Sequence, residues 1–267
     1  MNKDIILKTS VEIAQIRRAC RIAEKCLRHL AGFIAPGVTT RKLDEIAARF
    51  FANANAESAL KGYRGFPGNI CASVNNVAAH GVPSDHPLEE GDVVSLDITV
   101  KSLGWHGDAA WTYTVGAGSA ESRRLIRAAW KACLAGVKAA VAGARIGDVG
   151  SAIQEAAKEM GCAVVEDYVG HGIGRSMHED PMVLNFGEVD TGTRIVPGMV
   201  FTVEPILCLG SPEVRSVSGD GWTLATRDGG VSAQFEHTVA VFRDRTEVLT
   251  FSGGDIFAYL DFPPVLP

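Results

Sequence analysis

The sequence predicts an α+β fold in which two helices precede a strand-rich segment, and this order occurs twice along the chain. Four stretches show apolar residues at the spacing of amphipathic helices, and these stretches come in two pairs. Each pair is followed by a segment rich in Gly, Pro and β-branched residues, which favours strands and turns. We therefore expect two halves of similar architecture around a shared site.

The first helical pair begins at Thr9, which is placed to form a capping box with Glu12. This helix is expected to end near Gly32, after which Pro36-Gly37 forms a turn. Thr39 or Thr40 is the expected N-cap of the second helix. The apolar positions expected to face inward are Ile13, Ile16, Ala19, Cys20, Ala23 and Leu27 in the first helix, and Leu43, Ile46, Ala47 and Phe50 in the second.

The strands of the first half are expected in residues 62–115, including a run over 92–100. A second helical pair follows at about 120–142 and 148–160, the latter ended by Gly161. Strands and turns return over 163–251. The segment 252–267 ends in proline and is expected to form a C-terminal arm. Residues 1–251 would then form one domain, with halves at about 10–118 and 119–251.

An internal repeat supports the two halves. The turn at Pro36-Gly37 has a counterpart at Ala142-Gly143, 106 residues later. The run from Glu90 to Asp97 has a counterpart 107 residues later that ends at Glu204. Two unrelated α+β stretches with similar turns would give much the same texture. The matching carboxylate at the end of each run favours related halves.

Composition excludes several classes of protein. The chain of 267 residues is 46% hydrophobic and 21% charged, which excludes a disordered protein. Its net charge of −5, without a basic block, argues against nucleic-acid binding through phosphates. Its apolar runs are too short to span a membrane or to form a signal-peptide core. Six scattered cysteines indicate reduced thiols. The sequence thus predicts a compact cytoplasmic protein.

Five potential metal ligands lie in apolar, strand-like surroundings. Phosphate-loop, dinucleotide-binding, serine-nucleophile and H-E-x-x-H motifs are absent from the sequence. Ionised acids are rarely buried unless they are paired or bind metal, and few Lys or Arg residues accompany these. Four carboxylates and one imidazole suit two divalent cations. The five residues are Asp97, Asp108, His171, Glu204 and Glu236.

Each of these residues also has an ordinary structural interpretation. Asp97 or Asp108 alone is typical of a turn or a strand end, and Glu236 alone could pair with His237. A histidine between glycines, such as His171, is more often structural than a ligand. The metal site is favoured because all five residues occupy matching strand or turn positions.

Six ordered motifs lie at 63–67, 73–83, 91–97, 106–108, 170–179 and 232–238. Together they resemble the type I methionine aminopeptidases of the bacterial, minimal kind, and the resemblance covers residues 8 to about 241. The interval between Asp108 and His171 is too short for the helical insertion of the type II enzymes. The resemblance implies the pseudo-twofold "pita-bread" fold, an antiparallel sheet backed by two pairs of helices. It also implies removal of the N-terminal methionine from peptides and nascent proteins with a small second residue.

The resemblance assigns roles to the predicted ligands and to two further histidines. It implies two divalent ions (Co, Mn, Fe or Zn): Asp97 on one, His171 and Glu204 on the other, and Asp108 and Glu236 bridging both. A metal-activated hydroxide would attack the peptide carbonyl, with Glu204 as proton shuttle. His178 would donate a hydrogen bond to the carbonyl oxygen of the scissile peptide, and His80 would contact its nitrogen. Donors aimed at developing charge typically contribute 10²–10³ in rate.

The resemblance also implies a slot for the methionine side chain, which needs an apolar, polarisable lining. That lining is Leu60, Tyr63, Phe66, Cys71, Met177 and Trp222. Ordinary core packing also accounts for Leu60 and Cys71. A monovalent cation would be held by the backbone of Asn75, Val77 and Ser232. The sequence departs from the usual family residues at Leu60, Arg64, Ser95 and Met177, which puts details of specificity and efficiency in question.

Two other functions stay open at this point. One is an Xaa-Pro aminopeptidase or prolidase of the same fold, although those relatives usually carry a separate N-terminal domain. The other is a catalytically weak paralogue that binds partners such as ribosomes, which predicts lost ligands. The expected partners are peptides and nascent chains with N-terminal methionine, with transient ribosome association. We expect a monomer, without membrane or sequence-specific nucleic-acid binding.

Overall fold

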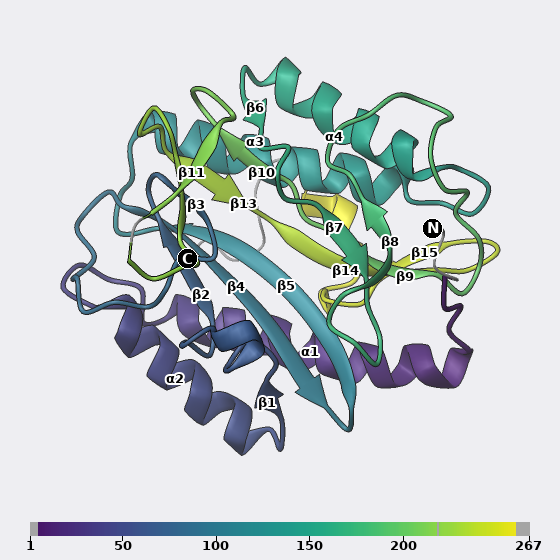
Figure 1. Cartoon of the computed structure of the whole chain (residues 1–267), viewed down its shortest axis with the longest axis horizontal. Helices are drawn as coiled ribbons and strands as arrows, with labels where there is room; N and C mark the ends of the chain where they lie inside the picture. Colours follow the sequence, from purple (N-terminus) through teal and green to yellow (C-terminus); the bar gives the residue numbers. More distant parts are fainter. Residues whose placement is uncertain (1–4, 218, 260–267) are drawn as a thin grey trace.

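The computed structural model of the chain describes residues 5–217 and 219–259 and has the predicted α+β architecture. In the view of Figure 1, α1 and α2 lie below the strands, whereas α3 and α4 lie above them. Of the predicted C-terminal arm, 260–267 fall outside the described residues. The part at 252–259 packs onto the domain, because Ile256 is buried and Trp130 donates a hydrogen bond to the Tyr259 carbonyl (2.7 Å).

The first helical pair forms as its caps predict. Helix α1 spans Ser10–Ala31, with the capping box of Thr9 and Glu12 present at its start. Helix α2 spans Thr40–Asn53, and the Thr39 hydroxyl accepts from the Lys42 amide. One inward position was wrong: Phe51 is buried in the core, whereas Phe50 is half-buried and lies beside the His29 ring. Phe51 lies four residues after the buried Ala47, so the two share one face of the helix.

The second helical pair is also present. Helix α3 spans Ala120–Ala139 and α4 spans Ile146–Glu159. Helix α4 begins two residues earlier than the predicted start at residue 148. The reason is that Asp148 is the third residue of α4 rather than its cap. Its carboxylate accepts a hydrogen bond from the Arg145 amide (2.7 Å), which satisfies a free N–H at the helix start. Gly161, which follows the helix, has the positive φ of 67° typical of a helix end.

The described strands form one nine-stranded sheet and two three-stranded ones, all with antiparallel pairs. The large sheet has the order β1-β4-β5-β14-β9-β7-β8, with β2 on β4 and β15 on β14. Its strands are β1 Glu57–Ser58, β2 Cys71–Val74, β4 Val93–Ser102, β5 Trp105–Thr114, β7 Gly170–Gly172, β8 Glu179–Val183, β9 Val200–Val203, β14 Glu236–Val241 and β15 Thr246–Val248. The small sheets join β13 (Ser232–Gln234), β10 (Ile206–Cys208) and β6 (Ala163–Val164), and β11 (Val214–Ser216), β12 (Leu224–Thr226) and β3 (Val77–Ala79). Two short 3₁₀ helices complete the fold, at Tyr63–Gly65 and Ile256–Tyr259.

One face of the large sheet packs on the helices. On β5, Gly107 lies so close to α1 that an added Cβ would sit 2.3 Å from the Cys20 amide nitrogen. Further along the sheet, His237 of β14 faces the Trp130 ring of α3 (centroids 5.7 Å apart). Because side chains alternate between the two faces of a strand, the neighbours of these residues point the other way. The opposite face of the sheet is therefore the one that can carry a site.

Two expectations from composition can be compared with the structure. All six cysteines lie in the described part of the chain and are free thiols, five of them buried. Within that part, no helix is both long enough and apolar enough to cross a membrane.

Candidate metal centre and active site

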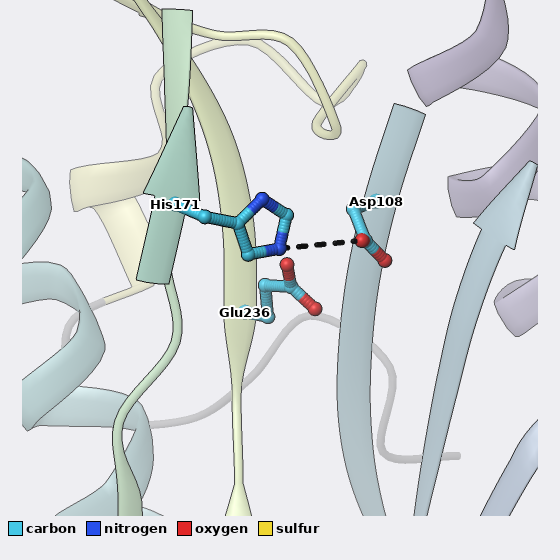
Figure 2. A group of neighbouring side chains, drawn as sticks. All are labelled: Asp108, His171 and Glu236. Atoms are coloured by element: carbon cyan, nitrogen blue, oxygen red, sulfur yellow. Dashed lines mark ion pairs between the residues drawn. The ribbon is translucent and has the colours of Figure 1, made fainter. Parts of the chain in front are cut away.

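Strand register brings three carboxylates to the same face of the sheet. Asp97 of β4 and Glu236 of β14 both lie opposite Ala110 of β5. Asp108 lies two residues before Ala110 on β5, so it points to the same side. Figure 2 shows Asp108 and Glu236 directed toward one another and toward His171. The alternation of side chains along three neighbouring strands is thus enough to cluster these acids.

His171 approaches the carboxylates from β7. Its Nε2 lies 3.9 Å from Asp108 Oδ2 and 3.6 Å from Glu204 Oε1, while its Nδ1 is bonded to the Gly172 carbonyl (3.0 Å). The Nδ1–H donates there, so the lone pair of Nε2 is directed at the acids. Burial lowers the pKa of His171 to about 3, which keeps the ring neutral. A neutral imidazole with its other nitrogen hydrogen-bonded is the form that binds metal.

Glu204 follows β9 directly. Val203 of β9 lies opposite His237, so the same register carried one residue further sets Glu204 opposite Glu236. The Thr202 hydroxyl donates to Glu204 Oε1 (2.6 Å) and accepts from the His171 amide (2.9 Å). Thr202 therefore fixes the position of both predicted ligands.

The clustered acids are not ion-paired with any Lys or Arg in the described part of the chain. Burial raises the pKa of Asp97 to about 7 and that of Glu204 to about 8. Burial and the neighbouring carboxylates raise the pKa of Asp108 and Glu236 well above the usual range. One oxygen each from Asp108 and Glu236 and one His171 nitrogen lie within 4.8 Å of one another. Such a donor set fits divalent cations, which would supply the missing positive charge.

A cavity of about 290 Å³ opens onto this cluster. Its lining contains all thirteen residues predicted as metal ligands, catalytic groups or methionine slot. They are Leu60, Tyr63, Phe66, Cys71, His80, Asp97, Asp108, His171, Met177, His178, Glu204, Trp222 and Glu236. One cavity thus unites residues from both halves of the chain.

Aromatic rings and two histidines form the walls of this cavity. The Trp222 ring meets Phe66 and His80 edge-on, with centroids 5.2 and 5.9 Å apart. His178 lies 4.3 Å from His171 by ring centroids, and its Nδ1 is hydrogen-bonded to the Tyr63 hydroxyl (3.0 Å). Burial lowers the pKa of both His80 and His178, which keeps them neutral.

The three residues predicted to hold a monovalent cation lie together but do not line the cavity. The Ser232 hydroxyl lies 3.2 Å from the Asn75 carbonyl oxygen and 2.9 Å from that of Val77. The Ser232 amide also donates to the Asn75 carbonyl (2.9 Å). Three oxygens therefore converge where β13 meets the turn between β2 and β3.

The cavity also contains residues that the sequence analysis did not identify. Thr99 lies opposite Asp108 and donates to it, with Oγ1 2.9 and 3.0 Å from the two carboxylate oxygens. Its position two residues after Asp97 in a predicted strand was the available signal. Tyr168 packs edge-on against His80 (5.1 Å) and had no such signal. Ala79, Val169, Ile206 and Gln234 complete the unpredicted lining, and Arg64, noted above as a departure from the usual family residue, also lines the cavity.

Comparison with known proteins decides the family. The model of metallopeptidase family M24 matches residues 14–242. The chain belongs to metallopeptidase family M24. It is 40% identical to a methionine aminopeptidase of Rickettsia prowazekii over 97% of this chain and 99% of the relative. The crystal structure of the R. prowazekii methionine aminopeptidase superposes with a TM-score of 0.92, covering 93% of this chain and all of that one.

More distant members share the fold alone. The prolidase from Pyrococcus furiosus superposes with a TM-score of 0.72 at 24% identity, covering 92% of this chain but 66% of the prolidase. The predicted pita-bread fold is confirmed by these neighbours together with the sheet and the four described helices. Membership of a metallopeptidase family, with the cluster of Asp108, His171 and Glu236, makes the chain a metal-dependent hydrolase.

Proposed function

We propose that this protein removes the N-terminal methionine from peptides and nascent chains whose second residue is small. The observation that carries the proposal is the single cavity in which five potential metal ligands adjoin an apolar, aromatic pocket. The relatives named methionine aminopeptidase, at about 40% identity over nearly the whole chain, support it. The Xaa-Pro hydrolases of the same fold match at 21–24% identity and are not favoured.

We propose two divalent ions per chain, drawn from Co, Mn, Fe or Zn. Asp97 would bind one ion, His171 and Glu204 the other, and Asp108 and Glu236 would bridge both. When bound, such ions activate water for attack and polarise the peptide carbonyl. The protein orients the ligands: Thr99 holds Asp108, Thr202 holds Glu204, and the Gly172 carbonyl holds the His171 ring.

His178, His80 and Glu204 are the proposed catalytic side chains. When the Tyr63 hydroxyl donates to His178 Nδ1, the proton of the neutral ring is on Nε2. Nε2–H can then donate to the carbonyl oxygen as negative charge develops there. His80, oriented by Tyr168 and Trp222, would contact the scissile nitrogen. Thr202 binds Glu204 through Oε1, so Oε2 is the oxygen that can hold the transferred proton.

The methionine side chain would occupy the pocket formed by Leu60, Tyr63, Phe66, Cys71, Met177 and Trp222. Phe66, Cys71 and Met177 are nearly fully buried, so a ligand there contacts sulfur and aromatic carbon rather than water. Met177 and Leu60 make this lining more deformable than an aromatic one. We infer that specificity for methionine is retained, with wider tolerance of unbranched analogues.

Further properties belong to the same proposal. We propose one catalytic domain over 1–251, built from related halves at about 10–118 and 119–251. The oxygens of Asn75, Val77 and Ser232 would hold a monovalent cation. We also propose a cytoplasmic monomer that contacts ribosomes transiently while acting on nascent chains.

The test is release of free methionine from Met-Ala-Ser and Met-Lys-Ser by metal-free protein titrated with Mn, Fe or Co. We expect metal-dependent release from the first peptide only. Bound metal without release would favour a binding role or a restricted substrate. Failure to bind any of the metals would refute the assignment of the five ligands.

A further inference from the structure

A buried ion pair outside the cavity joins the start of α1 to the loop that carries His178. Lys8 Nζ lies 2.5 Å from Glu179 Oε2, and the two side chains are 3% and 7% exposed. Glu179 is the first residue of β8, directly after His178. The two partners are 171 residues apart in the chain.

The loop between β7 and β8 is wrapped around this pair. The second oxygen of Glu179 accepts a hydrogen bond from the Ser176 amide (3.1 Å). A Cβ on Gly174 would lie 2.6 Å from Lys8 Cε and 2.7 Å from Glu179 Oε1, so the backbone is in contact with both side chains. One carboxylate thus binds the ammonium and the loop backbone together.

Lys8 itself is held from several directions. Its amide donates to the Gly198 carbonyl (2.7 Å), next to β9, and its ammonium also donates to the Ile6 carbonyl (2.9 Å). It directly precedes Thr9, the N-cap of α1. The ammonium therefore belongs to the rigid domain rather than to the loop.

The loop has other attachments as well: the Tyr63 hydroxyl is hydrogen-bonded to His178 Nδ1 (3.0 Å), and the Arg175 guanidinium lies 4.0 Å from the centre of the Trp105 ring. A further attachment lies at Gly174. The backbone amide and Nδ1 of His106 lie 2.9 and 3.1 Å from the Gly174 carbonyl oxygen. The segment 175–178, which includes Met177 and His178, follows that attachment. Its other end is fixed by Glu179.

We propose that Lys8, acting through Glu179, is a positioning residue that holds His178 and Met177 in their places over the metal centre. This inference rests on the proposed function. Replacing both partners of a buried ion pair by uncharged residues changes the stability of the fold little. Removing one partner leaves the other charge buried and uncompensated. Without the ammonium, Glu179 turns toward water and releases the Ser176 amide. His178 then keeps its hydrogen bond to Tyr63 but loses the backbone anchor beside it, so its distance to His171 and to the substrate carbonyl is less closely fixed.

The experiment compares Lys8→Met, Glu179→Gln and the double variant with a matched control, Arg17→Met. Arg17 also lies at the N-terminal side of α1 and forms a two-bond ion pair with Glu247, at 2.6 and 2.9 Å, away from the cavity. We expect Lys8→Met to lower kcat for Met-Ala-Ser roughly 10- to 100-fold, because small displacements of catalytic groups have effects of that size. Arg17→Met is expected to retain the wild-type kcat at temperatures below unfolding.

A readout independent of activity is hydrogen exchange of residues 173–179. We expect at least roughly tenfold faster exchange in Lys8→Met than in Arg17→Met, since the loop loses an anchor only in the former. In the double variant, the side-chain carbonyl oxygen introduced by Glu179→Gln can still accept a hydrogen bond from the Ser176 backbone amide. The loss of kcat in the double variant should therefore be smaller than the product of the two single effects.

Unchanged exchange and unchanged kcat in Lys8→Met would overturn the proposal. A Lys8→Met protein that fails to fold shifts the test to the double variant, which leaves no unpaired buried charge. In that variant, exchange and kcat both equal to wild type, with a metal-loaded wild type that is active, would also overturn it. An inactive wild type refutes the proposed function, whereas the exchange comparison still decides the positioning role.

Discussion

Removing the metal should make the stability of this protein fall steeply as the pH rises from about 7 to about 8. Four carboxyls face one another, two of them buried (Asp108 and Glu236) and two half-buried (Asp97 and Glu204), and none is paired with a described Lys or Arg. Burial raises the pKa of Asp97 to about 7 and that of Glu204 to about 8. In the unfolded chain such groups titrate near pH 4. Between these values the folded metal-free protein holds protons that the unfolded chain has lost. Stability present at the lower pH is therefore lost as pH rises through the folded pKa values.

The magnitude follows from the number of protons. Each carboxyl that is protonated only in the folded state contributes a slope of about 1.4 kcal/mol per pH unit. With the pKa values of Asp108 and Glu236 also raised well above the usual range, two to three such groups give a loss on the order of 3 kcal/mol over that interval. The interval begins near pH 7 because the buried neutral histidines, such as His171, give a slope of opposite sign below it.

Urea denaturation of chelator-treated protein at several pH values measures this loss. Metal-loaded protein is the first control, since its ligands are ionised in both states and its slope should be nearly flat. The variant Asp97→Asn/Glu204→Gln, also metal-free, should show a smaller slope, because two titrating groups are gone. A metal-free protein whose stability is constant or rises across the interval would refute the account of the site as uncompensated buried charge.

Three further outcomes are expected. Thr99→Val removes the hydroxyl that donates to both Asp108 oxygens and should weaken metal affinity, measured by calorimetry, roughly 10- to 100-fold; unchanged affinity would show that Thr99 does not orient Asp108. Met177→Phe should stiffen the proposed methionine slot and lower hydrolysis of norleucyl-Ala-Ser relative to Met-Ala-Ser roughly tenfold, measured as a ratio of kcat/KM; an unchanged ratio would place residue 177 outside the slot. Gly107→Ala puts a Cβ 2.3 Å from the backbone of α1 and should destabilise the fold by about 1–3 kcal/mol or more, measured by urea denaturation; a wild-type midpoint would mean that α1 can move away at little cost.

The elements that are fixed locally were the ones that the sequence predicted well. Capping residues and helical spacing located α1 and α2, since a cap such as Thr9 and the residues it bonds lie within one turn. Two errors are shifts of one or two residues. Packing decides that Phe51 rather than Phe50 faces the core, and one hydrogen bond from the Arg145 amide to the Asp148 side chain decides where α4 begins. Strands of two or three residues, such as β6, are too short for any alternating pattern to reveal.

The site was predicted as a set of residues, but its supporting contacts were not. The five candidate ligands carry motifs, whereas Tyr168 and the Lys8–Glu179 pair are recognisable only from contacts between distant parts of the chain. Thr99 and Thr202 are intermediate cases, because each lies two residues from a predicted ligand in the same strand or strand end. Strand alternation could have identified both.

That alternation also explains why the acids can remain buried. Facing the helices, β4 and β5 present Leu96, Ile98 and Val100 and their partners Trp111, Ala109 and Gly107. On the opposite face, where Asp97, Thr99 and Asp108 line the cavity, the middle of these strands presents polar or small side chains: Ser95, Asp97, Thr99, Asp108, Ala110 and Thr112.

On that polar face, the Ser and Thr hydroxyls form hydrogen bonds with one another and with backbone carbonyls. Ser95 and Thr112 are bonded to one another (2.7 Å), Thr112 donates to the Gln234 carbonyl (2.6 Å), and Thr238 donates to the Asp108 carbonyl (2.8 Å). Ala110, between Asp97 and Glu236, adds no bulk where the two carboxylates approach. The hydroxyl groups of this face thus have hydrogen-bond partners, whereas the negative charge of its carboxylates is not balanced by a described Lys or Arg. When the acids are ionised, cations held between them would supply the missing positive charge, so this face of the sheet links the fold to metal binding.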